Sequence, residues 1–209
     1  MKVYTEVAQG SDEWRALRLG VVTGSGFDSI LTPKTLKPAA GTADFNPLVA
    51  EILTGESQDD FDGTAFTERG TAMEDEARRW YAFHHGVTLT KVGFVARDDG
   101  RVGCSPDSLV GEDGGLEIKC PSAKVHVGYA LDHSTFVTAY RGQVQAALYI
   151  TGRAWWDLLS YSPDFEKLVV RCVRDDAYQA ALAPALDAFL ARIDAAVELL
   201  RPDLNLCPL

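Results

Sequence analysis

Residues 104–121 of the chain read CSPDSLVGEDGGLEIKCP. Side chains alternate between the two faces of a strand, so Glu117 and Lys119 are expected on one face, with their apolar neighbours turned into a core. Residues 102–110 predict a preceding strand, and the glycine-rich segment 111–115 predicts a turn that joins the two strands in a hairpin. Asp107 can then face Glu117.

Two carboxylates and one amine on a single hairpin allow two interpretations. Carboxylate oxygens suit Mg²⁺, which keeps several waters and binds through one or two carboxylates plus substrate phosphate. A neighbouring lysine can hold or help to deprotonate the attacking water while the metal polarises the phosphate. Alternatively, Asp107, Glu117 and Lys119 are solvated side chains on a surface hairpin, because such triplets are common by chance.

The composition favours one α/β domain over residues 1–209, since 209 residues with 46% hydrophobic content can bury a substantial core. No apolar run approaches the roughly 20 residues that span a bilayer, and residues 1–10 lack a signal-peptide pattern, so a cytosolic protein is expected. The four cysteines form no Cys-x-x-Cys pair, which argues against a zinc ribbon or an iron–sulfur cluster. The absence of His-Glu-x-x-His and Gly-x-x-x-x-Gly-Lys motifs argues against a zinc hydrolase and an ATPase.

The net charge of -10 is concentrated in one region. Residues 46–76 carry nine acidic residues and one basic residue, whereas the rest of the chain is close to neutral. We expect most of this acidic stretch to be a solvated loop. A basic channel elsewhere remains compatible with the total charge, because phosphate contacts depend on where Lys and Arg lie.

Further elements follow from periodicity, caps and glycines. Ser11 is expected to cap a short helix that contains Arg18, and a second helix begins near residues 23–25. A helix N-terminus suits a phosphate, so Arg18 and Ser25 form a candidate anion pocket, although Arg18 can equally be a surface ion-pair residue. The other expected elements are a loop at 33–42, a loop that holds His126 and His133, helices at 47–53, 65–85, 136–150 and 176–201, and strands at 87–96, 102–110, 116–120, 153–160 and 167–173.

Five segments in a fixed order carry a family resemblance: residues 13–23 (EWRALRLGVVT), 69–78 (RGTAMEDEAR), 104–107 (CSPD), 116–121 (LEIKCP) and 140–145 (YRGQVQ). With them the chain resembles the phage lambda exonuclease family, also called YqaJ-type viral recombinases, within the PD-(D/E)xK nuclease superfamily. The resemblance covers roughly residues 10–162. It implies an α/β restriction-endonuclease-like core with a central mixed β-sheet flanked by helices.

The resemblance also implies roles for individual residues. Asp107, Glu117 and the main-chain carbonyl of Ile118 would bind metal, Glu74 would be a further ligand or water organiser, and Lys119 would orient or activate water. The cofactor would be two Mg²⁺ ions, for which Mn²⁺ can substitute. The residues that match the pocket for the 5′-terminal phosphate are Arg18, Ser25, Ser105 and Gln143.

The function expected from this resemblance is a Mg²⁺-dependent double-strand DNA exonuclease for phage recombination. It would degrade the 5′-ended strand from 5′-phosphorylated ends, release mononucleotides and leave a 3′ overhang. A ring-shaped homotrimer and a single-strand annealing protein as partner, in the bacterial cytoplasm, belong to the same expectation. Two alternatives stay open: a RecB-like endo- or exonuclease of DNA repair, and a catalytically silent module that binds DNA ends.

Overall fold

The computed structural model describes residues 1–39, 44–58 and 65–201, and it describes the backbone alone at position 25 and at 65–72. The elements are β1 (Lys2–Tyr4), α1 (Asp12–Arg18), β2 (Val22–Thr23), a 3₁₀ helix η1 (Gly24–Ser29), α2 (Phe45–Thr54), α3 (Ala65–His85), β3 (Leu89–Thr90), β4 (Phe94–Ala96), β5 (Val102–Cys104), β6 (Ser108–Val110), β7 (Gly114–Lys119), α4 (Ala123–Leu131), α5 (His133–Thr151), β8 (Trp155–Ser160), β9 (Leu168–Val173) and α6 (Asp176–Leu200).

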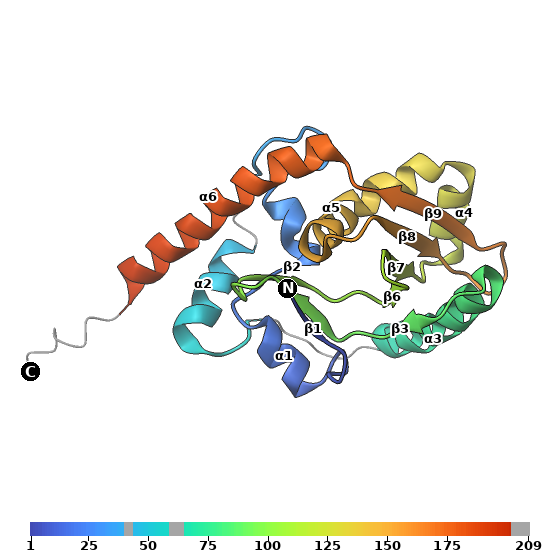
Figure 1. Ribbon diagram of the computed structural model, residues 1–209, viewed down its shortest axis with the longest axis horizontal. Coiled ribbons are helices and arrows are strands. Elements are labelled where there is room, and N and C mark those ends of the chain that lie inside the picture. The colour runs from blue at the N-terminus through green and yellow to red at the C-terminus, as the bar shows by residue number, and fades with distance from the viewer. Residues whose placement is uncertain (40–43, 59–64, 202–209) are drawn as a thin grey trace, which may run out of the picture.

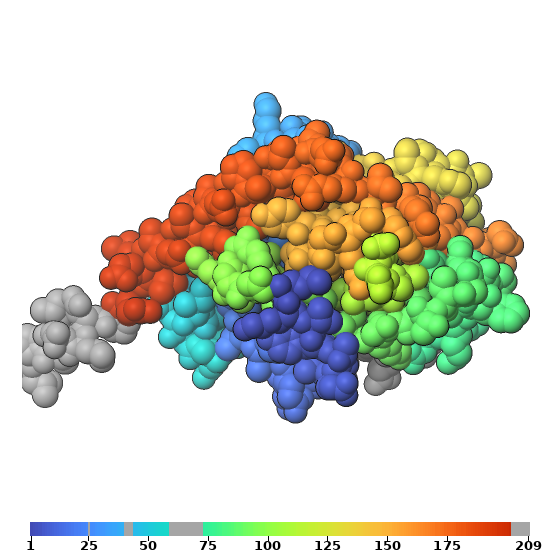
Figure 2. Space-filling view, viewed as in Figure 1, coloured from blue at the N-terminus to red at the C-terminus, as the bar shows by residue number. Residues whose placement is uncertain are grey.

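In Figure 1 the strands β3 and β6–β9 lie toward α3 and α4, while β1 and β2 lie beside α1 and α2. Figure 2 shows the long helix α6, in orange to red, running above α1 and α2.

The strands form two mixed sheets, in the orders β1-β4-β5-β2 and β3-β6-β7-β8-β9. The expected β6–β7 hairpin is present as an antiparallel pair, and β7 pairs in parallel with β8. The α/β class with helices flanking a mixed sheet is therefore confirmed, but the sheet is divided in two.

Two expected strands are divided between these sheets. Residues 102–110 form β5 and β6 on either side of Pro106, which has no N–H to give to a ladder. Residues 87–96 form β3 and β4, and between them the backbone at Gly93 approaches Val7 so closely that a Cβ would lie 2.0 Å from the Val7 carbonyl oxygen.

Most expected helices are confirmed, and one expected loop is wrong. The side chain of Ser11 caps α1 by accepting from the backbone N–H of Trp14 at 3.2 Å. The region around His126, expected as a loop, is the helix α4, separated from α5 by Asp132 alone. Asp132 ends α4 and also caps α5, so neither glycine nor proline marks the boundary. His126 is buried within α4, where its ring nitrogens contact the Ser160 hydroxyl at 2.8 Å and the Glu166 carbonyl at 3.0 Å.

The core explains the direction of the side chains on β7. Leu116 and Ile118 pack with Ala77 and Tyr81 of α3, as the alternation predicted. The buried Asp157 of β8 connects α3 to this sheet, because it accepts a hydrogen bond from the Tyr81 hydroxyl at 2.5 Å. It also pairs with Arg171 of the neighbouring strand β9 at 2.8 and 2.9 Å.

Tryptophan packing imposes a small residue at the start of β7. Trp156 is fully buried in the larger core cluster. Its ring lies against Gly115, where an added Cβ would meet ring carbon Cε3 at 2.2 Å. Glycine at this position therefore lets the indole lie flat on the strand.

Parts of two expected loops, residues 40–42 of one and 59–64 of the acidic stretch, lie outside the described residues. The expectation that most of residues 46–76 form a solvated loop is wrong, because α2 and α3 cover both ends of this stretch and Glu51 of α2 is buried. Residues 32–37 form a turn, in which the Leu36 N–H donates to the Thr32 carbonyl at 2.9 Å. None of the helices in the described parts of the chain has the length and apolar content that would span a membrane.

Candidate active site and phosphate pocket

The β6–β7 hairpin brings the two carboxylates of the sequence motif together. Ser108 is paired with Leu116, so Asp107, the residue before β6, lies level with Glu117. The backbone N–H of Ile118 donates to Asp107 Oδ2 at 2.5 Å and fixes this carboxylate against β7. Because a strand ladder and a hydrogen bond hold both groups, the site is part of the sheet and does not depend on a surface loop.

Glu117 is the centre of a second group of contacts. It is 5% exposed, and its Oε1 accepts from Lys119 Nζ at 2.7 Å and from Gln143 Nε2 at 2.5 Å. Lys119 Nζ also donates to Gln143 Oε1 at 3.1 Å and lies 4.7 Å from the ring centroid of Tyr140. The ammonium group is thus held by a carboxylate, an amide and an aromatic face. These contacts argue against the interpretation of a solvated surface hairpin.

Buried negative charge is the main electrostatic feature of the site. Burial raises the pKa of Asp107 well above its usual range, and the charges of Glu117 and Glu74 raise it further against the opposing Ile118 N–H and Lys119. Burial also raises the pKa of Glu74, where Arg78 opposes the effect and Glu117 adds to it. The structure therefore places Glu74 within the electrostatic reach of the hairpin carboxylates.

Lys119 responds to the same charges with the opposite sign. Burial alone would lower its pKa, but the charge and the hydrogen bond of Glu117, together with Asp107, raise it overall. A protonated Lys119 is thus favoured beside the carboxylates.

The donor set fits a hard divalent cation in kind. Two buried carboxylates and a third nearby repel one another, and a cation between them would relieve that repulsion. Within the described residues, no three His, Cys, Asp or Glu side chains are already arranged to hold a metal ion. Asp107, Glu117 and the main-chain carbonyl of Ile118 are the groups that would hold one, with Glu74 beside them.

Three of the four residues expected to bind phosphate share one small pocket. Arg18, Ser105 and Gln143 line it together with Gly24 and Glu117. Arg18 Nη1 donates to the Ser105 hydroxyl at 3.4 Å. The backbone of the fourth residue, at position 25, lies in η1, which begins at Gly24, and its side chain lies outside the described part of the structure.

Three residues of this region, Trp14, Arg78 and Tyr140, were not assigned a role from the sequence. Trp14 donates its indole N–H to Ser105 Oγ at 2.9 Å and to the Gly93 carbonyl at 3.1 Å, and the guanidinium of Arg18 lies 4.2 Å from its ring. Arg78 Nε donates to the Ser108 hydroxyl at 3.1 Å and the Asp107 carbonyl at 3.3 Å.

Helical spacing is the signal that could have found these residues. Trp14 lies four residues before Arg18 on α1, and Arg78 lies four residues after Glu74 on α3, so each shares a helix face with an assigned residue. Tyr140, the third such residue, lies three residues before Gln143 on α5.

A family model described as a YqaJ-like viral recombinase domain matches residues 13–154, well over half of the chain. The chain belongs to the YqaJ-like viral recombinase family. An alkaline exonuclease from Laribacter hongkongensis, LHK-Exo, is 33% identical, with a TM-score of 0.80 over 91% of this chain and 96% of that one. A crystal structure of LHK-Exo in complex with dAMP gives the same values.

A phage-related exonuclease from Haemophilus somnus 129PT has a TM-score of 0.66 at 15% identity, over 86% of this chain and 96% of that one, and shows the shared fold. No curated protein matches the sequence. The YqaJ-like domain includes every residue to which the sequence assigned a role, from Arg18 to Gln143. The family resemblance seen in the sequence is confirmed.

Proposed function

We propose that this YqaJ-like protein is a Mg²⁺-dependent exonuclease that degrades the 5′-ended strand of duplex DNA, releases mononucleotides and leaves a 3′ overhang. Family membership and the likeness to an alkaline exonuclease support exonuclease activity on DNA. The position of Gln143 is the observation that supports digestion from the 5′ end. Its amide contacts Glu117 and Lys119, and the same side chain lines the pocket with Arg18 and Ser105.

In this proposal the hairpin supplies the catalytic groups. Asp107, Glu117 and the Ile118 carbonyl would hold the metal, and Glu74 would add a ligand or order a water. Two Mg²⁺ ions, for which Mn²⁺ could substitute, would supply the positive charge that polarises the scissile phosphate and offsets the negative charge that develops on it. Lys119 orients or activates the attacking water from its place beside Glu117.

The pocket beside the hairpin would set the direction of cleavage. Arg18, Ser25, Ser105 and Gln143 hold the terminal 5′-phosphate, and the next phosphodiester then falls at the carboxylates. Water attacks the phosphorus of that diester, the 3′-oxygen of the terminal nucleotide leaves, and a new 5′-phosphate remains on the shortened strand. Each cycle thus produces the group that the pocket binds, which supports repeated cleavage.

The assembly and the cellular role are proposed from the family alone. A ring-shaped homotrimer would enclose the duplex, and a single-strand annealing protein would receive the 3′ overhang during phage recombination in the bacterial cytoplasm. The description of the family as viral recombinases supports this role.

The decisive experiment digests end-labelled linear duplex, with or without a 5′-phosphate, in Mg²⁺ and then in chelator. Mononucleotides released from 5′-phosphorylated ends in Mg²⁺ alone are the expected result. Cleavage of closed circular duplex would instead indicate an endonuclease of the RecB-like kind, and binding without any product would indicate a silent end-binding module. Arg18→Ala should shorten each run of cleavage, whereas Asp107→Ala and Lys119→Ala should abolish cleavage in a folded protein.

A further inference from the structure

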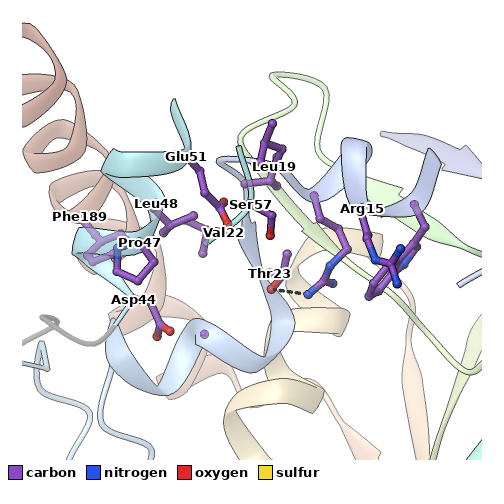
Figure 3. Close-up of a pocket in the computed structure, with 14 residues that line it drawn as sticks. Arg15, Leu19, Val22, Thr23, Asp44, Pro47, Leu48, Glu51, Ser57 and Phe189 are labelled. Atoms are coloured by element: carbon purple, nitrogen blue, oxygen red, sulfur yellow. Dashed lines mark hydrogen bonds between the residues drawn. The ribbon is translucent and has the colours of Figure 1, made fainter. Parts of the chain in front are cut away.

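The short helix η1 lies between the helix α5 and a cavity. The cavity has a volume of about 560 Å³ and is lined mainly by residues of α1, β2, η1, α2 and α6. Figure 3 shows Thr23, the N-cap residue of η1, and Asp44 on its wall. Because the cavity leaves room for η1 to shift, the distance between η1 and α5 depends on the direct contacts between these two helices.

Two consecutive residues of α5 make such contacts. At the start of η1, a Cβ added to Gly24 would lie 3.8 Å from Gln143 Cγ, and both of these residues line the phosphate pocket. Near the end of η1, the carboxylate of Asp28 lies against Gly142, where an added Cβ would be 1.7 Å from Asp28 Oδ1. Only glycine at position 142 therefore allows Asp28 to keep this place.

The carboxyl group of Asp28 is partly withdrawn from water. Asp28 is exposed as a whole residue, but burial of its carboxyl group raises the pKa of that group. In the described parts of the chain no cation stands close enough to oppose this effect. The contact with α5 thus costs solvation of the carboxylate, and an ion pair does not offset that cost.

Tyr178 of α6 directs its hydroxyl group to the same point. Tyr178 is fully buried, and among the described residues its hydroxyl oxygen has no hydrogen-bond partner. This oxygen would lie 3.5 Å from the Cβ added to Gly142, which is also the position closest to Asp28 Oδ1. Burial and then the negative charge of Asp28 raise the pKa of Tyr178 to about 12. The Asp28 carboxylate is therefore an acceptor within reach of this phenol.

The ring of Tyr178 is itself held in place. Its backbone N–H, in the first turn of α6, donates to the N-cap residue Asp175 at 3.0 Å. The guanidinium of Arg141 lies 5.3 Å from the ring centroid. The Asp28 carboxylate thus lies between two fixed groups, the Gly142 backbone and the Tyr178 hydroxyl, and it belongs to η1.

We propose that Asp28 is a positioning residue that sets the preference for 5′-phosphorylated ends. Through its contact with Gly142 and Tyr178 it keeps η1 against α5, so that the start of η1 stays at a fixed distance from Gln143 across the phosphate pocket. Asp28 is not among the described residues that line this pocket, so it acts through η1. The inference rests on the proposed 5′-end recognition and adds a residue that controls it.

Gly142→Ala tests this role with a single methyl group. The added group takes the place of Asp28 Oδ1, and the carboxylate can turn away into solvent because Asp28 is exposed. Alanine favours a helical backbone more than glycine does, so α5 should not lose stability. Gly128→Ala is the matched control, since Gly128 lies within α4 and no described atom lies within 4 Å of a Cβ added there.

The measurement is fluorescence anisotropy of linear duplex, with and without a 5′-phosphate, in chelator. The readout is the ratio of the two dissociation constants, because a merely structural role would weaken both kinds of end alike and leave that ratio unchanged. Gly142→Ala should lower the preference of the wild type for phosphorylated ends by about three- to tenfold, on the scale of one hydrogen bond. Gly128→Ala should keep the preference.

Variants of Asp28 test the same contact from the other side. Asp28→Ala should lower the preference as much as Gly142→Ala, and the double variant should lower it no further, because both changes remove one contact. Asp28→Asn keeps the size of the side chain and an acceptor oxygen, so it should retain most of the preference. These two variants decide the matter if Gly142→Ala does not fold.

The inference would be overturned by an unchanged preference in both Gly142→Ala and Asp28→Ala, or by a double variant whose loss is the product of the two single losses. A wild type that binds both kinds of end equally would refute the phosphate pocket, and the role of Asp28 with it. Digestion of the same duplexes in Mg²⁺ tests the proposed activity separately. A wild type that prefers phosphorylated ends but digests nothing would refute the activity, while a loss of preference in Gly142→Ala would still support the role of Asp28.

Discussion

Replacing Asp107 with Asn should make the metal-free protein more stable while removing its response to Mg²⁺. Asp107 is a buried carboxylate whose pKa is raised by burial and by the charges of Glu117 and Glu74. Asn keeps the shape and can still accept from the Ile118 N–H, which now donates to Asp107 Oδ2 at 2.5 Å. The substitution therefore removes mainly the electrostatic repulsion between Asp107 and the carboxylates of Glu117 and Glu74.

The pH dependence follows from the direction of that pKa. A carboxyl with a higher pKa in the folded than in the unfolded protein begins to reduce stability as pH rises above the unfolded value, and the full loss is reached above the folded value. The advantage of Asp107→Asn should thus be absent in acid and largest in alkaline buffer. A single stabilising substitution commonly contributes about 0.5–2 kcal/mol to the free energy of unfolding. For a chain of 209 residues, each kcal/mol corresponds to about 2–4 °C in melting temperature.

The assay is thermal unfolding in chelator and in Mg²⁺ at several pH values. Wild type should gain stability on addition of Mg²⁺, since an ion that binds the folded state raises its melting temperature. Asp107→Asn should have a higher melting temperature than wild type in chelator at alkaline pH, and Mg²⁺ should raise that temperature little. Asp187→Asn, on the exposed face of α6, is the control and should behave as wild type does. Repulsion between the carboxylates would be refuted as the cause if Asp107→Asn melted below wild type in chelator at alkaline pH. It would also be refuted if Mg²⁺ raised the melting temperature of Asp107→Asn as much as that of wild type.

Three further substitutions test individual contacts. Trp14→Phe removes the indole N–H that holds the Ser105 hydroxyl, so the preference for 5′-phosphorylated over unphosphorylated ends should fall by about tenfold in a competition digest, whereas an unchanged preference would contradict the positioning role. Asp157→Asn removes a buried charge that receives hydrogen bonds from α3 and β9; urea unfolding should show a loss of about 1–3 kcal/mol, and no loss would mean that the neutral amide satisfies the same donors. Gly115→Ala sets a Cβ about 2.2 Å from the Trp156 ring and should lower the melting temperature by the equivalent of about 1–3 kcal/mol, unless the strand and the indole can separate.

The parts of the fold that the sequence predicts are those with local causes. The β6–β7 hairpin follows from the alternation of apolar and charged residues on β7 and from the glycines at its start. The register of this hairpin places Asp107 opposite Glu117. The division of residues 102–110 between two sheets could not be predicted, although Pro106 marks the place, because the partner strands come from distant parts of the chain. The helix α4 was not predicted because Asp132 is both the last cap of α4 and the first cap of α5, so no loop residues separate the two helices.

The candidate site shows the same limit. The family resemblance names Arg18, Ser105 and Gln143, but only the fold shows that they line one pocket. Helical spacing from Arg18 points to Trp14, but not to its partner Ser105, which lies 91 positions away in sequence. Contacts of this separation depend on how α1 packs against the rest of the fold, which alternation and capping do not encode.

One amide couples the two halves of the site. Gln143 Nε2 donates to Glu117 and Gln143 Oε1 accepts from Lys119, so both ends of the amide are fixed by catalytic candidates, while the side chain lines the pocket with Arg18. The Gln143 amide nitrogen carries two N–H groups, so a phosphate in the pocket can accept from one while the other still donates to Glu117 Oε1. The phosphate pocket and the metal candidate Glu117 then share one amide, and a cation that moves Glu117 also moves a donor of the pocket. Binding of the strand end and binding of the metal are therefore expected to be coupled, and by linkage the effect must be equal in both directions.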